Sequence, residues 1–250
     1  MYENDYKRRR DDVRWYVAQC RDQAYPRHPP VLELGCGAGR ITLPMLRQGI
    51  SVVGVDLNMP MLERAKERIV AAGRRMKAPW HLLHGDMRAL PLAEGAFHRI
   101  ICPFNTFMHL YLAPDITAAL REIHRLLHPQ MGRFIFDVLN PDLRWLTRDP
   151  AKRWAKTHFK HPETGQRYLY STNHTYDPRR QICFVNIYYD CLDEPARSVR
   201  QMIAHRQFFP QELYGLLRHH GFLVEREYGD FHGHAFEGES TELVLVCRRA

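Results

Sequence analysis

The sequence predicts an α/β protein built on a mostly parallel sheet, with an antiparallel β segment inserted late in the chain. Two patterns lead to this fold class. Over residues 31–140, short apolar runs alternate with helical patterns, which is typical of a parallel sheet covered on both faces. Over 142–208, three aromatic and β-branched runs follow one another with no helical pattern between them, as in an antiparallel meander.

A leading amphipathic helix is expected over residues 11–25, because Val13, Tyr16 and Cys20 fall on one helical face before a proline-rich stretch. The main sheet then follows in order. We expect its first five strands at 31–35, 51–56, 80–86, 97–104 and 131–140, and the helices between them at 40–48, 59–72 and 114–127.

The inserted strands are expected at 168–177, 181–190 and 198–209, with the turn sequences DPRR and DEPA between them. A helix at 210–221 resumes the main fold, since Pro210 suits a first helical turn and Gly221 a C-terminal cap. Strands at 222–231 and 241–249 complete it. The predicted domains are therefore 1–141 with 209–250, and an inserted β cap over 142–208.

The composition is that of an ordinary globular protein, with 45% hydrophobic and 26% charged residues. No apolar run approaches the length needed to cross a bilayer, and the first residues show no apolar core of a secretory signal. We therefore expect a cytoplasmic protein with no membrane partner. The six cysteines form no C-x-x-C pair and are expected to be buried thiols.

The net charge is +8, but most arginines are interleaved with acids. The one dense basic run, Lys7 to Arg10, is followed at once by two aspartates. The favoured interpretation is a solvated surface, and a nucleic-acid partner stays an alternative.

The stretch VLELGCGAGRIT places three glycines directly after the first strand. Their spacing differs from the G-x-G-x-x-G of dinucleotide folds. Gly35 and Gly37 allow a ligand to lie against bare backbone, and Gly39 begins a helix whose free N–H groups suit a carboxylate. Glu33 is a lone carboxylate inside an apolar run. A turn built only for packing is the alternative.

Acidic residues follow the next two strands. Asp56 ends the second strand about twenty residues after the glycines, where an acid accepts ribose hydroxyls. Asp86 follows the third strand and is placed to accept from an exocyclic amine, with Met87 and Leu57 as apolar walls for a flat base. As an alternative, either aspartate caps a helix.

The fourth strand ends in Pro103-Phe104-Asn105, at the edge where the reacting end of a ligand would lie. All of these residues fall at carboxyl ends of successive parallel strands, where open α/β sheets bind ligands. Together they fit a ligand with an anionic end, a ribose and an amino-bearing base.

The segments ELGCGAGR, VGVDLNMPML, HGDMRALPL and FHRIICPFNTFMHL resemble the motifs of the class I S-adenosylmethionine-dependent methyltransferases, whose first motif is E/D-x-G-x-G-x-G. The resemblance covers the first five strands and resumes over the last helix and two strands. It implies a Rossmann-like seven-stranded sheet with the last strand antiparallel, the cofactor S-adenosyl-L-methionine and the product S-adenosyl-L-homocysteine. The residues it implies for cofactor binding are Glu33, Gly35, Cys36, Gly37, Gly39, Asp56, Leu57, Met61, Asp86, Met87, Pro103 and Asn105.

The order F-N-T-F-M-H-L-Y is similar to a small-molecule subset of this class, the aminosugar N-methyltransferases and glycine N-methyltransferase-like proteins, whose members often carry an antiparallel sheet after strand five. The stretch ICPFNTF lacks the second proline of the base-modifying [DNS]-P-P-[YF] motif, and Cys102 precedes its proline inside a strand. Both departures count against nucleobase chemistry. By the resemblance, His109 is a candidate general base; a hydrogen-bonded, half-buried histidine is the alternative.

Aromatic residues are the candidate substrate contacts. By alternation Tyr168, Tyr170 and His174 share one strand face, and each strand face either packs against the core or lines the acceptor pocket. Near the N-terminus, Tyr2, Tyr6 and Tyr16 are candidates for a lid over the sulfonium. The full set of candidate substrate residues is Tyr6, Tyr16, Tyr168, Tyr170, His174 and Tyr188.

We expect no metal site, because His232 and His234 have no further ligand at matching spacing. The predicted function is methyl transfer to an oxygen or nitrogen atom of a small molecule. Two alternatives stay open: an RNA or protein methyltransferase, and a protein that binds S-adenosylmethionine without transfer. The sequence predicts no oligomeric state.

Overall fold

The computed structural model describes residues 10–21, 29–75, 78–162 and 164–250, and these form two compact units. The first unit contains the described residues up to Asn140 together with Phe209–Ala250. The second unit is Pro141–Phe208. The sequence predicted junctions after residues 141 and 208.

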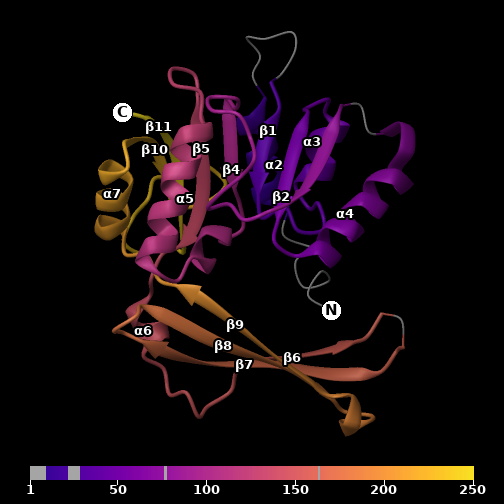
Figure 1. Ribbon diagram of the computed structural model, residues 1–250. Coiled ribbons are helices and arrows are strands. Elements are labelled where there is room, and N and C mark those ends of the chain that lie inside the picture. Colours follow the sequence, from indigo (N-terminus) through magenta and orange to yellow (C-terminus); the bar gives the residue numbers. More distant parts are fainter. Residues whose placement is uncertain (1–9, 22–28, 76–77, 163) are drawn as a thin grey trace. The chain divides into compact units, whose positions relative to one another are not determined.

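The first unit contains a seven-stranded sheet of order β10-β11-β5-β4-β1-β2-β3 (Figure 1). β1 pairs in parallel with β2 and β4, which continue in parallel to β3 and β5, whereas β11 is antiparallel to both β5 and β10. The predicted sheet with its last strand antiparallel is confirmed. The strands are β1 (Val31–Leu34), β2 (Val52–Asp56), β3 (Trp80–His84), β4 (Arg99–Cys102), β5 (Arg133–Leu139), β10 (Phe222–Tyr228) and β11 (Glu242–Arg249).

Helices alternate with these strands, as the sequence predicts. They are α2 (Asp11–Cys20), α3 (Thr42–Arg47), α4 (Met59–Ala72), α5 (Ala113–Leu126) and α7 (Pro210–His219), with short 3₁₀ turns η1 (Gly73–Arg75) and η2 (Thr106–His109). Every residue of β1 is buried, and Tyr16 and Cys20 of α2 belong to the same core cluster as Met45 of α3. Because a helix as short as α2 is marginal alone, it depends on this packing.

β3 and β4 are among the strands that end earlier than the sequence suggested. β3 stops at His84, and two residues later a turn begins that bridges Asp86 to Ala89. β4 stops at Cys102 because Pro103 has no N–H to donate to the ladder and Phe104 lies in the left-handed region. Of the predicted leading helix, residues 22–25 lie outside the described part of the chain.

The second unit is a four-stranded antiparallel sheet of order β6-β7-β8-β9 (Figure 1). Its strands are β6 (Trp154–Lys160), β7 (Arg167–Asp177), β8 (Ile182–Cys191) and β9 (Val199–Arg206), accompanied by α6 (Leu143–Leu146) and the 3₁₀ turn η3 (Pro195–Arg197). The predicted meander is confirmed over β7 to β9. The strand β6 was not predicted, because WAKTHFK is an exposed strand with little apolar patterning.

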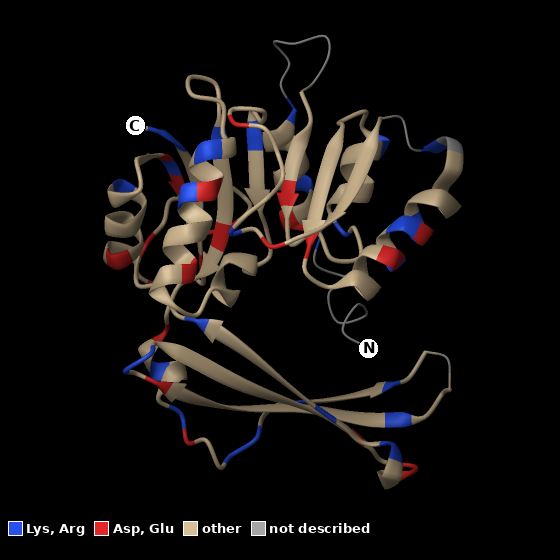
Figure 2. Ribbon diagram, viewed as in Figure 1, with Lys and Arg blue, Asp and Glu red and all other residues tan. Residues whose placement is uncertain are grey.

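Basic and acidic residues are interspersed in both units (Figure 2). In the second unit the basic ones prevail, with 12 Lys and Arg against 7 Asp and Glu over 141–208. All six cysteines are buried thiols, as expected. Among the described residues, no helix combines the length and apolar character that crossing a membrane requires.

Candidate functional site

The glycine turn after β1 exposes backbone because three of its residues have a positive φ. Gly35, Gly37 and Gly39 have φ values of 68°, 53° and 76°, a region that side-chain-bearing residues rarely adopt. A Cβ on Gly35 would overlap Cγ2 of Thr106 and lie 2.9 Å from its Oγ1. The turn after β1 is therefore pressed directly against the segment that follows β4.

Glu33 lies beneath this turn and is 1% exposed. Its Oε2 accepts a hydrogen bond of 2.6 Å from Oγ1 of Thr42. Burial raises the pKa of Glu33 to about 7, against the opposing effects of the Thr42 hydrogen bond and of the Arg40 charge. This carboxyl group is thus close to half-protonated at neutral pH, and its contact with the first residue of α3 fixes that helix to β1.

Asp56, at the end of β2, connects two loops of the site. Its Oδ2 accepts from the Gly37 N–H at 2.7 Å, and its Oδ1 accepts from the Asn58 N–H at 2.8 Å. A carboxylate has about four acceptor positions, so roughly two are left for ligand hydroxyls. Leu57 is 63% exposed beside it, and Met61 approaches the glycine turn, with its Cε 3.6 Å from where a Gly37 Cβ would stand.

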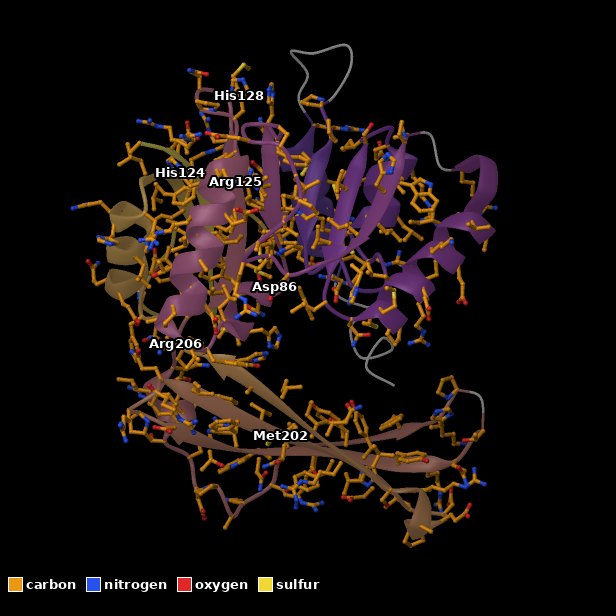
Figure 3. The ribbon with its side chains drawn as sticks, in the orientation of Figure 1. Asp86, His124, Arg125, His128, Met202 and Arg206 are labelled. Atoms are coloured by element: carbon orange, nitrogen blue, oxygen red, sulfur yellow. The ribbon has the colours of Figure 1, made fainter. Side chains whose placement is uncertain are left out.

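Asp86 lies in the loop after β3, where Figure 3 labels it. Both of its carboxylate oxygens accept from the guanidinium of Arg88, at 2.5 to 3.0 Å, and this hydrogen bonding is the main cause that lowers the pKa of Asp86. Arg88 also pairs with Asp115 in the first turn of α5. The amine of a bound base would therefore have to share Asp86 with Arg88, a partner that no sequence pattern indicated. Met87 is half-buried next to it.

The segment after β4 makes an unusual turn. Phe104 and Asn105 both have left-handed backbone, with φ of 59° and 58°. Their N–H groups donate to the two oxygens of Asp137 on β5, at 2.8 and 2.9 Å. The Oγ1 of Thr106 donates to the Pro103 carbonyl at 2.7 Å. These hydrogen bonds hold the turn in place next to the glycine turn, which Thr106 contacts.

His109 ends η2, four residues beyond Asn105, and its side chain is exposed. Its Nδ1 lies 3.2 Å from the hydroxyl of Tyr111. The residue is accessible and follows the turn after β4, and its role as a base stays a prediction.

The structure corrects the expectation for Tyr16. Its side chain is 0% exposed, and its hydroxyl donates to Oδ1 of Asp137 at 2.5 Å. A side chain enclosed in this way packs the core and has no face to offer a sulfonium. The other candidates for the lid, Tyr2 and Tyr6, lie outside the described residues.

In the second unit, His174 is a packing residue. It is 3% exposed, and its ring stacks on Trp145 with centroids 3.9 Å apart. Its Nε2 lies 2.7 Å from the Trp145 carbonyl and therefore carries the proton of this hydrogen bond. Tyr168 is 5% exposed within a small core cluster. For these two residues the structure favours a role in packing over a role in lining the acceptor pocket.

The predicted substrate residues of this unit also do not share a face. Tyr188 pairs with Ser171 across the β7–β8 ladder, and cross-strand partners point to the same side of a sheet. Tyr170 neighbours Ser171 in sequence and therefore points to the opposite side. The Tyr188 ring is covered by the guanidinium groups of Arg153 and Arg200, 3.7 and 5.4 Å from its centroid.

The described residues contain no group of three or more His, Cys, Asp and Glu side chains that could hold a metal ion. Of the two histidines considered from the sequence, His234 instead hydrogen-bonds Asp230 at 2.6 Å, which raises the pKa of that histidine.

Several residues of the site were not predicted from the sequence: Thr42, Arg88, Thr106, Asp115 and Asp137. Asp137 could have been found, because it is a lone carboxylate in the apolar run FIFDVL, the same signal that singled out Glu33. The others are common polar residues whose role depends on how the loops fold together.

Comparison with known proteins agrees with this geometry. Residues 31–130 match a family model described as "Methyltransferase domain". A curated malonyl-[acyl-carrier protein] O-methyltransferase of Legionella pneumophila is 33% identical over 114 residues, 45% of this chain and 37% of that protein. The chain spans about half or less of the length of the curated relatives it matches.

Solved structures share the fold over nearly the whole chain. The CcbJ methyltransferase of Streptomyces caelestis has a TM-score of 0.77 at 23% identity, covering 96% of this chain and 94% of that one. CalS10, an amino pentose methyltransferase of Micromonospora echinaspora, has a TM-score of 0.71 at 19% identity, covering 99% and 96%. These matches agree with the resemblance found in the sequence: residues 31–130 match a methyltransferase domain, and the solved structures share the fold over nearly the whole chain.

Proposed function

We propose that the protein transfers a methyl group from S-adenosyl-L-methionine to an oxygen or nitrogen atom of a small molecule and releases S-adenosyl-L-homocysteine. One observation carries the proposal: the positive-φ glycine turn, Asp56 and the left-handed turn after β4 converge at one edge of the parallel sheet. The methyltransferase domain matched over 31–130 contains all of them.

The residues present fit such a cofactor. Among the described residues, only Met61 comes within 4 Å of the position that a Cβ on Gly37 would take, so the backbone there is open to a ligand. Asp56 keeps acceptor positions for ribose hydroxyls. The exposed Leu57 offers an apolar surface to a base. Asn105 has a buried Oδ1 with no hydrogen-bond partner among the described residues; buried polar groups of this kind call for a ligand or another explanation.

When bound, S-adenosylmethionine supplies an electrophilic methyl group on a positively charged sulfur. The protein's contribution is then mainly alignment, which can supply roughly 7–11 kcal/mol. His109 is the residue proposed to take a proton from the acceptor, since an exposed imidazole is the side chain best suited to act as a general base near neutral pH.

A small polar acceptor is supported by the inserted sheet after β5 and by structures of like fold, which include an amino pentose methyltransferase. The basic excess of the inserted unit supports RNA as the second candidate.

Calorimetry with S-adenosylhomocysteine tests the donor site. We expect binding to the wild-type chain and at least roughly tenfold weaker affinity for Asp56→Ala, because this substitution removes the proposed ribose acceptor and frees the Gly37 N–H. Glu67→Gln on the exposed face of α4 is the matched control. Unchanged affinity in Asp56→Ala would contradict the assigned site, and no binding to the wild type would overturn the function.

Transfer of labelled methyl from S-adenosylmethionine tests the acceptor. Amino sugars and other small amines and alcohols are compared with total RNA and with protein, at low and high salt. Label in a small molecule supports the proposal, and salt-sensitive label in RNA supports the second candidate. With the true acceptor, His109→Ala should lose about 100-fold or more in kcat; a loss below about threefold excludes it as the base.

A further inference from the structure

The left-handed turn at Phe104 and Asn105 needs a physical cause. Two consecutive non-glycine residues with φ near 60° are each costly. Such backbone persists only where surrounding contacts hold it. Here those contacts are the two backbone N–H groups that donate to Asp137.

Asp137 can hold the turn only if its own carboxylate is satisfied. It is 2% exposed, and burial raises its pKa, while hydrogen bonds from Tyr16, Asn105 and Phe104 oppose this rise. Its hydrogen-bond partners among the described residues are these three donors, none of which is a cation. The loss of a hydrogen-bond donor to a buried charge is strongly unfavourable. Tyr16 is therefore one of the three donors that stabilise the carboxylate which fixes the turn.

Tyr16 belongs to α2, and the same helix reaches the glycine turn through a second buried acid. Asp12 is 2% exposed and binds the guanidinium of Arg40 through both oxygens, at 3.0 and 2.5 Å. Arg40 directly follows Gly39. Its guanidinium also lies over the Phe104 ring, 4.5 Å from the centroid.

These contacts form a closed circuit. It runs from the glycine turn through Arg40 to Asp12, along α2 to Tyr16, across to Asp137, and back through Phe104 to Arg40. Each member is a buried or half-buried residue of the first unit. The two loops that the circuit joins are those proposed to hold the cofactor.

We infer that α2 is a positioning element for methyl transfer: Tyr16 and Asp12 hold the turn after β4 and the glycine turn in register with each other. Neither residue is catalytic, since both act through others. The inference rests on the methyl-donor site proposed above and is independent of the acceptor.

Removal of the Tyr16 hydroxyl has a specific consequence. It leaves Asp137 with two donors, so the left-handed turn opens more often while the sheet remains folded. Opening of this turn exposes the Phe104 and Asn105 amides and loosens one wall of the cofactor site.

The test compares Tyr16→Phe with Tyr214→Phe in the full chain. Tyr214 is the matched control, because its hydroxyl also donates to a carboxylate, that of Glu227 at 2.8 Å, on α7 and β10 away from the cofactor loops. Amide hydrogen exchange reports opening at Phe104 and Asn105, and calorimetry reports affinity for S-adenosylhomocysteine. Asp12→Asn, which breaks the other arm of the circuit, is measured in parallel.

In Tyr16→Phe we expect exchange at these two amides to be about ten- to hundredfold faster, which corresponds to the loss of a hydrogen bond to a charged group. Affinity for S-adenosylhomocysteine should fall at least roughly threefold, and Tyr214→Phe should change neither. If Tyr16→Phe does not fold, Asp12→Asn takes its place in the test, and we expect the same faster amide exchange and weaker affinity for S-adenosylhomocysteine in that variant.

Exchange and affinity equal to those of Tyr214→Phe would overturn the inference, as would exchange that rises equally over the whole sheet. Failure of the wild type to bind S-adenosylhomocysteine would instead contradict the proposed function, because the exchange at Phe104 and Asn105 is read without ligand.

Discussion

The substitution Gly35→Ala isolates the fit between the glycine turn and the turn after β4. An alanine at φ 68° costs about 1–2 kcal/mol in backbone strain. Its Cβ would also overlap Cγ2 of Thr106 and lie 3.2 Å from Thr106 Cβ, and overpacking of this kind costs about 1–3 kcal/mol more. We expect a loss of about 2–5 kcal/mol in the free energy of unfolding.

Gly49→Ala is the matched control, because Gly49 has φ of 82° and no atom lies within 4 Å of the position that its Cβ would take. The difference between the two variants in denaturant unfolding therefore measures the steric part alone. The double substitution Gly35→Ala with Thr106→Ala should recover part of that difference, since it removes the overlapping methyl group. Equal losses in Gly35→Ala and Gly49→Ala would refute the close packing of the two loops.

Two further predictions concern acidic residues. Burial raises the pKa of Glu33 from its ordinary 4.5 to about 7, so the native state holds this proton more tightly, and the stabilising effect of about 3 kcal/mol is lost as pH rises from about 4.5 to 7. Glu33→Gln should therefore gain stability relative to wild type over that range in denaturant titrations, and parallel pH profiles would contradict the raised pKa. Arg88→Ala frees both oxygens of Asp86 and should change affinity for S-adenosylhomocysteine more than affinity for its adenine-free part, homocysteine. Equal changes for the two ligands would show that Asp86 does not contact the base.

The main sheet could be predicted from the sequence because its signals are local. Apolar runs alternate with helical patterns, and glycine, aspartate or proline marks the turns after most of the strands β1 to β5. The same locality made Gly35, Asp56 and Asp86 recognisable. The local sequence does not predict the contacts of Asp86, since nothing in it indicates that this residue pairs with Arg88 rather than staying open to a ligand.

Contacts between distant segments could not be predicted. Tyr16 and Asp137 are 121 residues apart, and the helical pattern of α2 shows only that Tyr16 faces inward. An inward-facing tyrosine fits a lid and a core equally well. Only the partner of its hydroxyl decides between them, and that partner lies on a strand whose neighbours are set by the whole sheet.

The register between the strands of the inserted unit could not be predicted either. Alternation along β7 correctly places Tyr168, Tyr170 and His174 on one face, but it says nothing about which face of β8 joins them. A slip of one residue in the β7–β8 pairing would exchange the two faces of β8. The observed register pairs Tyr170 with Tyr189 and Ser171 with Tyr188, so Tyr189 enters the cluster with Tyr168 and Tyr188 is left on the other side beneath Arg153.

Any acceptor contacts from this sheet must come from one of these two faces, and the variants Tyr170→Phe and Tyr188→Phe distinguish them. Each substitution removes one hydroxyl and keeps the ring, so the strand pairing is left intact. We expect the KM for the acceptor to rise in one variant and to stay unchanged in the other, which identifies the face that contacts the acceptor. Because the two side chains point to opposite sides, an equal rise in both variants would contradict the register.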